Sequence, residues 1–508
     1  MISSVLSGLR TLATGRGFGM LFVLVLVVWA YGECLSFGSL NYDDPMYISN
    51  PGGASDGLDL KVLVWSLTAT RSNLWHPLTW LSFQIECAVA GNSKWQGTLH
   101  HLSNLLLYLA MLAVMAWGLL RLKLPAWGSV LFLAAFGLHP LHVESVAWIS
   151  SRKDVLSGLF QALCLVVYLT EWKSRRPWLT LIFFLLAVLS KPSAIVTPAL
   201  LILINEALRK RDGETSCLGS VRGITGQLLE KRWFWAIAFL SACGTIWVQA
   251  QGTMAGVSQS AGLIDRLALV PAKIGAYFSK VFVPVHLTFE YPTPSLLPLI
   301  GFSLLGLIVV LVPLVEYLRH RSFSWLGLAL LWFLVCISPV LGWVLVSDSF
   351  INDRYAFWAM AGPIAWLIGF AFKISSRAAA IAGVLIVGWF LVATRQQVSV
   401  WQTDESLFRH ALTLYPAHLT ALGNMGTLER SGGNDDSALG YYNRALRVNP
   451  RDHIVLYNKA QILARKGQIE EAIRVCEQCL EAYPNYEGAV NLQKFLLLKS
   501  KGNTAPPR

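Results

Sequence analysis

Long apolar runs, recurring from Met20 to Thr394, constrain the fold of this chain more than any other feature of its sequence. Several of them reach the roughly 18–20 residues that a helix needs to cross a bilayer. Of the 508 residues, 55% are hydrophobic and 14% are charged, which is too apolar for an ordinary water-soluble protein. From Trp401 to Arg508 the sequence becomes mixed and charged. We therefore predict a membrane domain over residues 1–395 and a second domain over residues 396–508.

Basic residues in short loops between the apolar runs account for much of the formal net charge of +12. Loops rich in lysine and arginine face the cytoplasm, so this charge predicts topology and requires no nucleic-acid partner. No small-residue cleavage site follows the first apolar run, and we expect that run to stay as the first helix. The loops predicted to be cytoplasmic contain Arg10 and Arg16; Arg121 and Lys123; Lys173, Arg175 and Arg176; Arg209, Lys210, Arg211, Arg222, Lys231 and Arg232; Arg319 and Arg321; and Lys373 and Arg377.

If the basic loops lie inside and the loops between them lie outside, the chain has eleven spans, with the N-terminus inside and the C-terminal domain outside. The stretch 267–287 contains two lysines and two prolines. We interpret it as interfacial or re-entrant, because one more crossing would place the later basic loops on the wrong side. The first outer loop, 36–98, contains DLKVLVWSLTA, which is too short to span and is interpreted as a helix on the membrane surface. The expected spans cover residues 18–35, 99–120, 127–142, 155–169, 178–189, 194–208, 233–250, 297–318, 326–343, 357–372 and 378–393.

The C-terminal domain repeats with a period of 34 residues, marked by Pro416, Pro450 and Pro484. This period, with small residues at packing positions, is typical of tetratricopeptide repeats, which are paired helices. The eight cysteines are scattered and suggest no disulfide framework. The pair in CEQC, Cys476 and Cys479, falls at positions that the repeat assigns to the core, so we expect packing rather than redox or metal chemistry. The predicted helices cover residues 403–416, 419–431, 436–448, 454–466 and 469–482, with a closing helix after residue 486.

Ionisable residues gather at the span ends that this topology places outside. Such groups are costly near membrane depth, so a function is the first interpretation. Carboxylates can take a proton from a hydroxyl or hold a metal, whereas lysine and arginine can bind phosphate. Beside a bilayer, the mixture predicts a lipid phosphate that carries a transferable group. The set comprises Asp43, Asp44, His76, Glu86, His100, His101, His139, His142, Glu144, Arg152, Lys153, Asp154, Lys191, Glu290, Asp353 and Arg354.

The members of this set also have purely structural interpretations. The adjacent aspartates fit a solvated turn, and Asp353 can pair with its neighbour Arg354. His139 and His142 have the spacing of a metal pair, but Pro140 interrupts the regular helix that would align them, so we predict no metal site. Joint occurrence on one face is what favours a functional interpretation.

An ordered series of motifs is similar to a known family. The motifs are NYDDPMYISNP, NLWHPLTWLSFQIEC, HHLSNLLLYL, LHPLHVESVAWISSRKDVLS, LSKPSAIVTPALLIL and NDRYAFWAM. Together with the repeats, they resemble the transmembrane and tetratricopeptide-repeat-containing O-mannosyltransferases and their bacterial relatives, which belong to the GT-C class of glycosyltransferases. The resemblance implies an all-α fold, in which a polytopic membrane helix bundle of about eleven spans is followed by a short tetratricopeptide-repeat solenoid.

The same resemblance implies a function. A sugar would pass from a polyprenyl-phosphate-linked donor to a protein or envelope acceptor on the noncytoplasmic side of a bacterial inner membrane. The periplasmic repeat domain would hold the acceptor, since stacked helix pairs form concave binding surfaces. One base and one leaving phosphate imply inversion at the sugar carbon, and a divalent metal is possible but not required.

The resemblance also assigns roles to residues. Asp43 is expected to be the general base, and Asp44 is expected to orient it or the acceptor. The expected donor-phosphate ligands are Lys191 and Arg354, with Arg152, Lys153, His139 and His142 as second choices. The residues expected to contact the acceptor or the sugar are His76, Glu144, Glu290 and Tyr291.

Two other functions fit parts of the same pattern. The protein could be a noncatalytic membrane scaffold whose repeats recruit envelope-assembly partners. It could also be a flippase or transporter for lipid-linked glycans, but a transport path would place charged residues through several helices rather than at one face.

Overall fold

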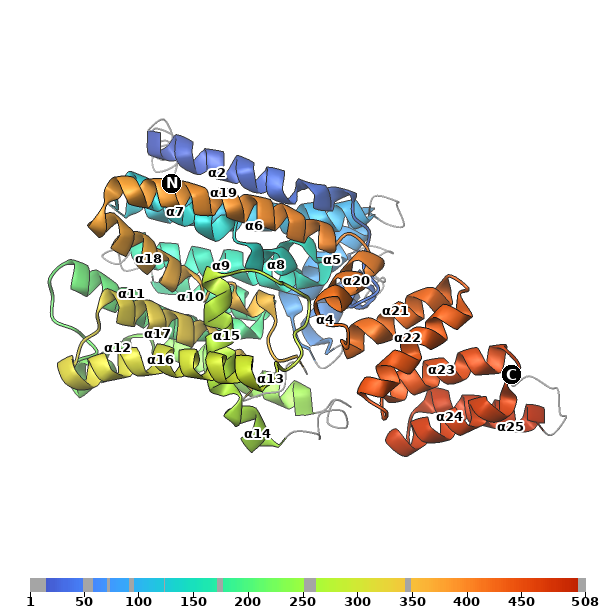
Figure 1. The fold of residues 1–508 in the computed structure, drawn as a ribbon. Helices are drawn as coiled ribbons and strands as arrows, with labels where there is room; N and C mark the ends of the chain where they lie inside the picture. Colours follow the sequence, from blue (N-terminus) through green and yellow to red (C-terminus); the bar gives the residue numbers. More distant parts are fainter. Residues whose placement is uncertain are drawn as a thin grey trace. The chain divides into compact units, whose positions relative to one another are not determined.

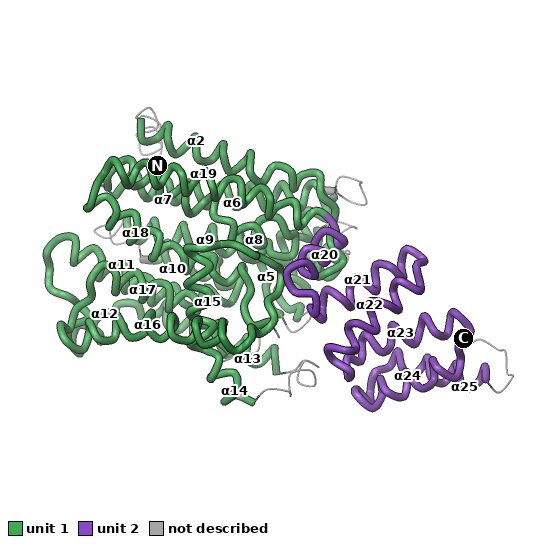
Figure 2. Tube along the Cα trace, viewed as in Figure 1, with its two compact units in different colours: residues 1–402 green, residues 403–508 purple. Residues whose placement is uncertain are grey.

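The computed structural model describes residues 15–48, 58–70, 74–90, 96–122, 124–170, 177–250, 262–342 and 349–500. Over these residues the fold is helical and contains no strand, as the sequence predicts. The chain divides into two compact units, Met1–Gln402 and Thr403–Arg508 (Figure 2). The boundary lies beyond residue 395 because the last membrane helix continues without a break to Val400. Among the basic-loop residues, Arg10, Lys123, Lys173, Arg175 and Arg176 lie outside the described residues.

The first unit is a bundle of helices interrupted by short 3₁₀ turns (Figure 1). In chain order its elements are α2 (Gly15–Tyr31), η1 (Gly32–Ser36), α3 (Asp44–Ile48), α4 (Leu60–Thr68), α5 (Pro77–Ala90), α6 (Gln96–Arg121), α7 (Ala126–Gly137), η4 (Pro140–His142), α8 (Val143–Ala147), η5 (Ile149–Ser151), α9 (Arg152–Thr170), α10 (Pro177–Ser190), η6 (Pro192–Val196), α11 (Thr197–Arg211), α12 (Val221–Glu230), α13 (Arg232–Ala250), α14 (Leu263–Ala268), α15 (Val270–Phe282), α16 (Leu296–His320), α17 (Trp325–Ile337), η8 (Ser338–Val340), η9 (Asp353–Ala356), α18 (Ala361–Ile374) and α19 (Ser376–Val400).

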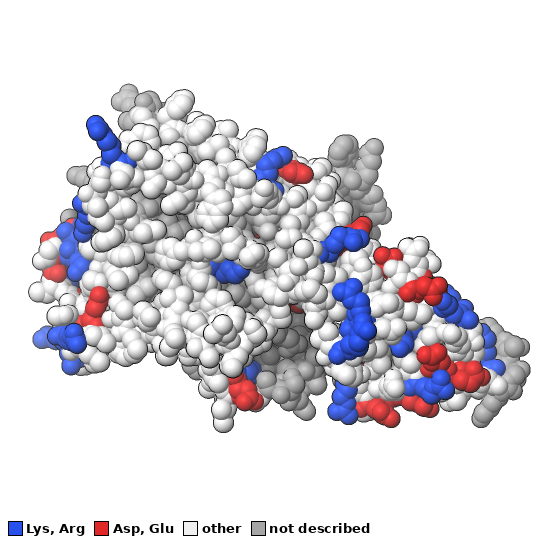
Figure 3. Space-filling model, viewed as in Figure 1, with Lys and Arg blue, Asp and Glu red and all other residues white. Residues whose placement is uncertain are grey.

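Within the described residues, seven helical segments are long and apolar enough to cross a membrane. An eighth is formed if α7 and the segment Pro140–Ala147 count as one span bent by 46°. Three shorter apolar helices, built on α10, α17 and α18, fall where the remaining spans were predicted. The face of the first unit in Figure 3 is broadly uncharged; a group of lysine, arginine and acidic side chains lies near α12, and a few others are scattered over the face. The chain is therefore a multi-pass membrane protein, and the count of eleven spans stays a prediction.

Some predicted helix bounds shift at prolines and short turns. The helix expected over 127–142 ends at Gly137, and Pro140, which has no N–H to donate, starts the 3₁₀ turn η4 instead. The helix expected from residue 357 begins at Ala361, because η9 occupies the chain just before it. The stretch 267–287 forms the end of α14 and the helix α15, and neither is among the candidate spans.

Two glycines allow α15 to pack directly against α16. A Cβ atom added to Gly275 would lie 1.9 Å from the carbonyl oxygen of Phe302, and one added to Gly306 would lie 1.9 Å from that of Pro271. Such distances leave no room for a side chain. The close crossing holds α15 against the bundle, next to the segment that carries Glu290.

The second unit is a stack of antiparallel helices, α20 (Asp404–Leu414), α21 (Leu419–Ser431), α22 (Asp435–Val448), α23 (His453–Arg465), α24 (Ile469–Ala482) and α25 (Glu487–Ser500). The helices agree with the predicted positions to within one or two residues. The repeat's small residues, Ala438 and Ala472, are fully buried, and so are Cys476 and Cys479. The CEQC cysteines therefore serve packing, as their place in the repeat predicts.

Candidate active site

A cavity of about 600 Å³ in the first unit gathers five of the predicted site residues. Its polar wall comes from loops and helix starts that are far apart in the sequence. Its apolar wall comes from α13 and from the end of α17, through residues that include Trp235, Ala242, Ile246 and Val335. The site residues that line it are Asp43, His76, Lys153, Lys191 and Arg354.

Asp43 occupies the turn before α3 and is exposed to this cavity. No hydrogen bond joins its carboxylate to a side chain or backbone group that the structure describes. Although the side chain is exposed, the surrounding protein removes enough solvent to raise the pKa of Asp43. Lys153 and Arg354 oppose this shift, and Glu290 adds to it. A carboxylate whose oxygens accept no hydrogen bond from the described residues, and whose pKa is raised, is suited to accept a proton.

Asp44, in contrast, is buried, and both of its carboxylate oxygens accept hydrogen bonds from the protein. One oxygen accepts from the backbone N–H of Leu40 at 2.8 Å, and the other accepts from Ser150, through the backbone N–H at 2.9 Å and the hydroxyl at 2.5 Å. The two bonds from Ser150 tie the first outer loop to η5, which ends two residues before Lys153. Asp44 therefore fixes the position of its neighbour Asp43 relative to the cations.

Lys191 and Arg354 each face the cavity while paired with a buried acid. Lys191 precedes Pro192, which favours the extended backbone seen at this residue, and its ammonium pairs with Asp154. Arg354 pairs with Glu144 through its guanidinium, and its backbone N–H donates to the same carboxylate at 2.9 Å. Each acid lowers the cost of burying its cation.

Lys153 is held by neutral groups. Its ammonium donates to the carbonyl of Ser150 at 2.7 Å and to the hydroxyl of Tyr47 at 3.2 Å, and it lies 5.5 Å from the centre of the Trp148 ring. The guanidinium of Arg354 lies 5.6 Å from the same ring. Trp148 therefore lies close to two cations of the cavity wall.

Arg152 does not line the cavity. Its guanidinium lies 2.5 Å from the Glu86 carboxylate, donates to the side chain of Asn104 at 2.8 Å, and covers the Phe83 ring at 4.0 Å. Glu86 also pairs with His100. This buried network joins α5, α6 and α9, so Arg152 contributes to packing beside the site.

His139 and His142 also lie away from the cavity. His139 contacts the backbone carbonyl of Val281 at 2.9 Å, and His142 contacts those of Phe136 at 2.9 Å and Phe357 at 3.2 Å. The two rings fix the bend between α7 and α8. No cluster of three or more histidine, cysteine or acidic side chains placed to hold a metal occurs among the described residues.

The predicted contacts Glu290 and Tyr291 lie beside the cavity rather than in its lining. Glu290 accepts a hydrogen bond from the hydroxyl of Tyr42 at 2.6 Å, next to Asp43. Tyr291 donates to Asp353 at 2.8 Å, and burial raises the pKa of that carboxyl to about 7. The alternative in which Asp353 pairs with Arg354 is wrong, because the cation pairs with Glu144 instead.

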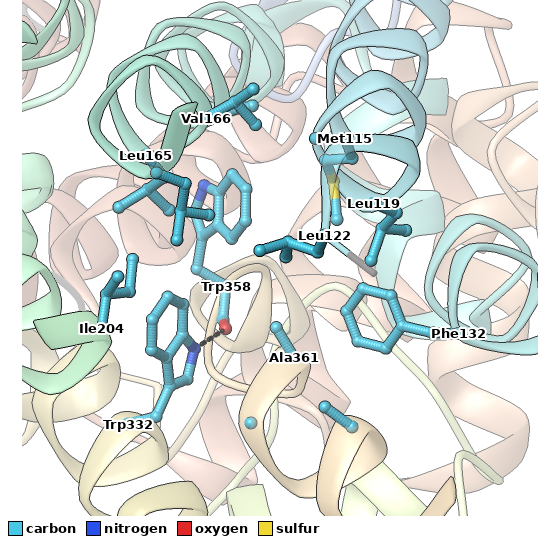
Figure 4. Close-up of a pocket in the computed structure, with 15 residues that line it drawn as sticks. Met115, Leu119, Leu122, Phe132, Leu165, Val166, Ile204, Trp332, Trp358 and Ala361 are labelled. Carbon is cyan, nitrogen blue, oxygen red and sulfur yellow. Dashed lines mark hydrogen bonds between the residues drawn. The ribbon is translucent and has the colours of Figure 1, made fainter. Parts of the chain in front are cut away.

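A second cavity, of about 240 Å³, lies between α6, α7, α9, α11, α17 and α18 (Figure 4). Leu119, Phe132 and Ile204 are among its lining residues, and none of the side chains that line it is ionisable. The indole N–H of Trp332 donates to the backbone carbonyl of Trp358 at 2.8 Å at its edge. This cavity lacks groups for acid–base chemistry.

Sequence reasoning missed the aromatic part of the site. Trp148 and Tyr355 line the cavity, and the Tyr355 ring lies 5.0 Å from the Lys191 ammonium and 4.9 Å from the Arg354 guanidinium. Both aromatic residues occur in motifs that the charged residues already singled out, VAWISSRKD and NDRYAF. Their positions close to these charged residues in the sequence could have indicated that they belong to the site.

Comparisons with known proteins agree with this architecture. The tetratricopeptide repeat family matches residues 424–487. The chain is 24% identical to Protein O-mannosyl-transferase TMTC4 of Mus musculus over 73% of its own length and 58% of that protein, and 24% identical to TMTC4 of Homo sapiens over the same shares. It is 31% identical to Protein O-mannosyl-transferase TMTC2 of Mus musculus over 22% of this chain and 14% of that protein.

The chain thus spans a little under three fifths of the TMTC4 proteins that it matches. The match extends well beyond the repeat unit, because it covers 73% of a chain of which the repeats form the last part. Similarity to the TMTC proteins, membrane helices and tetratricopeptide repeats are all found in this chain, as the sequence motifs predict. The chain is therefore similar to the protein O-mannosyl-transferases of the TMTC group.

Proposed function

We propose that this protein is a membrane glycosyltransferase that uses a polyprenyl-phosphate-linked sugar as its donor. The observation that carries the proposal is the cavity of about 600 Å³, in which the Asp43 carboxylate shares the wall with Lys153, Lys191 and Arg354. The names of the matched relatives supply the reaction class, since they are protein O-mannosyl-transferases.

The chemistry follows from the charges. The Asp43 carboxylate takes the proton of an acceptor hydroxyl, whose oxygen forms a bond to the anomeric carbon of the sugar. The bond between that carbon and the phosphate oxygen breaks, and its electron pair leaves with the polyprenyl phosphate. Lys191 and Arg354 stabilise the charge that develops on the leaving phosphate. A single displacement of this kind inverts the anomeric carbon.

The apolar wall fits the lipid part of such a donor. Side chains of α13, a candidate span, form one side of the cavity beside the cations. A polyprenyl chain buried there gains roughly 25 cal/mol for each Å² of apolar surface removed from water. Donor binding would therefore combine a phosphate contact at the loops with apolar contacts along a membrane helix. We place this site on the noncytoplasmic side of a bacterial inner membrane, and we propose that the repeat unit presents a protein or envelope acceptor.

The test is sugar transfer by the purified full-length protein. Wild type and the variants Asp43→Asn, Lys191→Ala and Arg354→Ala would be incubated with a polyprenyl phosphate mannose and membrane extract, and released polyprenyl phosphate would be measured. We expect each variant to lose at least 100-fold in rate. The matched control is Glu33→Gln, since Glu33 is a carboxylate of the same unit that forms a surface pair with Arg395 at 3.4 Å.

The scaffold alternative rests on the repeat unit, whose helix pairs are complete. It predicts that Asp43→Asn behaves as wild type in cells, whereas disruption of the repeat core at Ala438 or Ala472 abolishes function. Transfer activity that survives in Asp43→Asn would refute the proposed base.

A further inference from the structure

His76 is a buried polar group of the cavity for which the proposed reaction has no use. Its side chain lines the cavity, the residue is 4% exposed, and neither ring nitrogen has a hydrogen-bond partner among the described residues. A buried polar group that lacks a partner destabilises the folded protein. In the wall of a ligand cavity, such a group indicates that a ligand completes its hydrogen bonds.

The imidazole is fixed in place at the start of α5. The backbone carbonyl of His76 accepts a hydrogen bond from the N–H of Trp80 at 2.9 Å, and the two rings lie 6.4 Å apart. The hydroxyl of Thr79 donates to the carbonyl of Ser190 at 2.9 Å. This bond ties α5 to the residue directly before Lys191, so the imidazole and the ammonium belong to one rigid wall.

The ring nitrogens require a ligand that both donates and accepts. Burial lowers the pKa of His76 well below its usual range, and the charges of Lys153 and Lys191 lower it further. A neutral imidazole carries one N–H donor and one acceptor nitrogen. A phosphate diester has acceptor oxygens alone and leaves the acceptor nitrogen unpaired, whereas sugar hydroxyls donate and accept and satisfy both nitrogens.

We propose that His76 binds hydroxyl groups of the donor sugar and thereby distinguishes a sugar-bearing lipid phosphate from the bare lipid phosphate. This inference rests on the proposed function. The cations bind the phosphate that donor and product share, while His76 binds the part that is transferred. Loss of the His76 contact after transfer weakens the hold on the product and favours its release.

The experiment compares two probes on the full-length protein in nanodiscs. One is farnesyl phosphate, and the other is farnesyl phosphate that carries mannose, with glucose and N-acetylglucosamine versions in parallel. Wild type is expected to bind at least one sugar-bearing probe more tightly than the bare probe. His76→Ala is expected to weaken that binding by roughly 30-fold, the value of about two neutral hydrogen bonds, and to leave farnesyl phosphate binding unchanged. His76→Gln keeps a donor and an acceptor and is expected to restore part of the difference.

Lys191→Ala is the matched control, because it is expected to weaken all probes equally. Equal loss for bare and sugar-bearing probes in His76→Ala, no loss for either, or no discrimination by wild type would each overturn the sugar contact. A sugar-selective loss in His76→Ala together with unchanged binding in Lys191→Ala would support the sugar contact and contradict the proposed phosphate site. Thermal unfolding of each variant checks that the fold is kept.

Discussion

Exchanging each of the two adjacent aspartates for asparagine should separate catalysis from stability. Asp44 receives three hydrogen bonds on its two carboxylate oxygens, from Leu40 and from two groups of Ser150. Asparagine has one acceptor oxygen, so its NH₂ group must face at least one buried backbone N–H. A hydrogen bond to a charged acceptor contributes about 1.5–3 kcal/mol, and Asp44→Asn should destabilise the protein by that amount.

Asp43→Asn should leave stability nearly unchanged. The Asp43 carboxylate has no hydrogen bond to another described residue, and its raised pKa means that the folded protein already disfavours its charge. We therefore expect a change within about 0.5 kcal/mol, as for a surface substitution. The same variant should lose sugar transfer, because the amide cannot accept the proton of the acceptor hydroxyl.

The assay is unfolding of both full-length variants in detergent, followed by the rate of polyprenyl phosphate release. Glu33→Gln serves again as the control for a surface carboxylate. Two results would refute the reasoning. In one, Asp43→Asn unfolds as easily as Asp44→Asn, which would make both residues structural. In the other, Asp44→Asn keeps full stability, which would mean that its hydrogen bonds do not hold the loop.

Three further outcomes are expected. The pKa of Asp43 lies above the usual aspartate range, and protonation removes the base. Sugar transfer should therefore fall as pH drops through that pKa. A pH–rate profile of kcat/KM that stays flat down to the ordinary aspartate pKa would contradict this. Arg152→Met should cost about 3–5 kcal/mol, because the buried Glu86 carboxylate loses its guanidinium partner and keeps only His100, and adding Glu86→Gln should recover much of this in unfolding measurements. Gly426→Ala should destabilise the repeat unit by about 1–3 kcal/mol, because its Cβ would lie 2.4 Å from a buried tyrosine ring, whereas Gly440→Ala, which meets open space, should not; limited proteolysis of the full chain reports both.

The sequence by itself determined where the helices lie and which of them are membrane helices or repeat helices. Apolar runs of spanning length and the 34-residue period are local patterns, and helix formation depends on contacts three or four residues apart. The proline at residue 140 and the ionisable groups at span ends are likewise visible without a structure. The placement of Cys476 in the repeat core followed from the same periodicity.

Only the tertiary structure decided which charges share the cavity. Arg354 pairs with Glu144, 210 residues away, and not with its neighbour Asp353. Lys153 faces the cavity while the adjacent Arg152 is enclosed by Glu86 and Asn104 on other helices. Neither distinction appears in the sequence, because the partner of a long charged side chain is set by which helix ends pack together, and that packing depends on contacts between segments far apart in the chain.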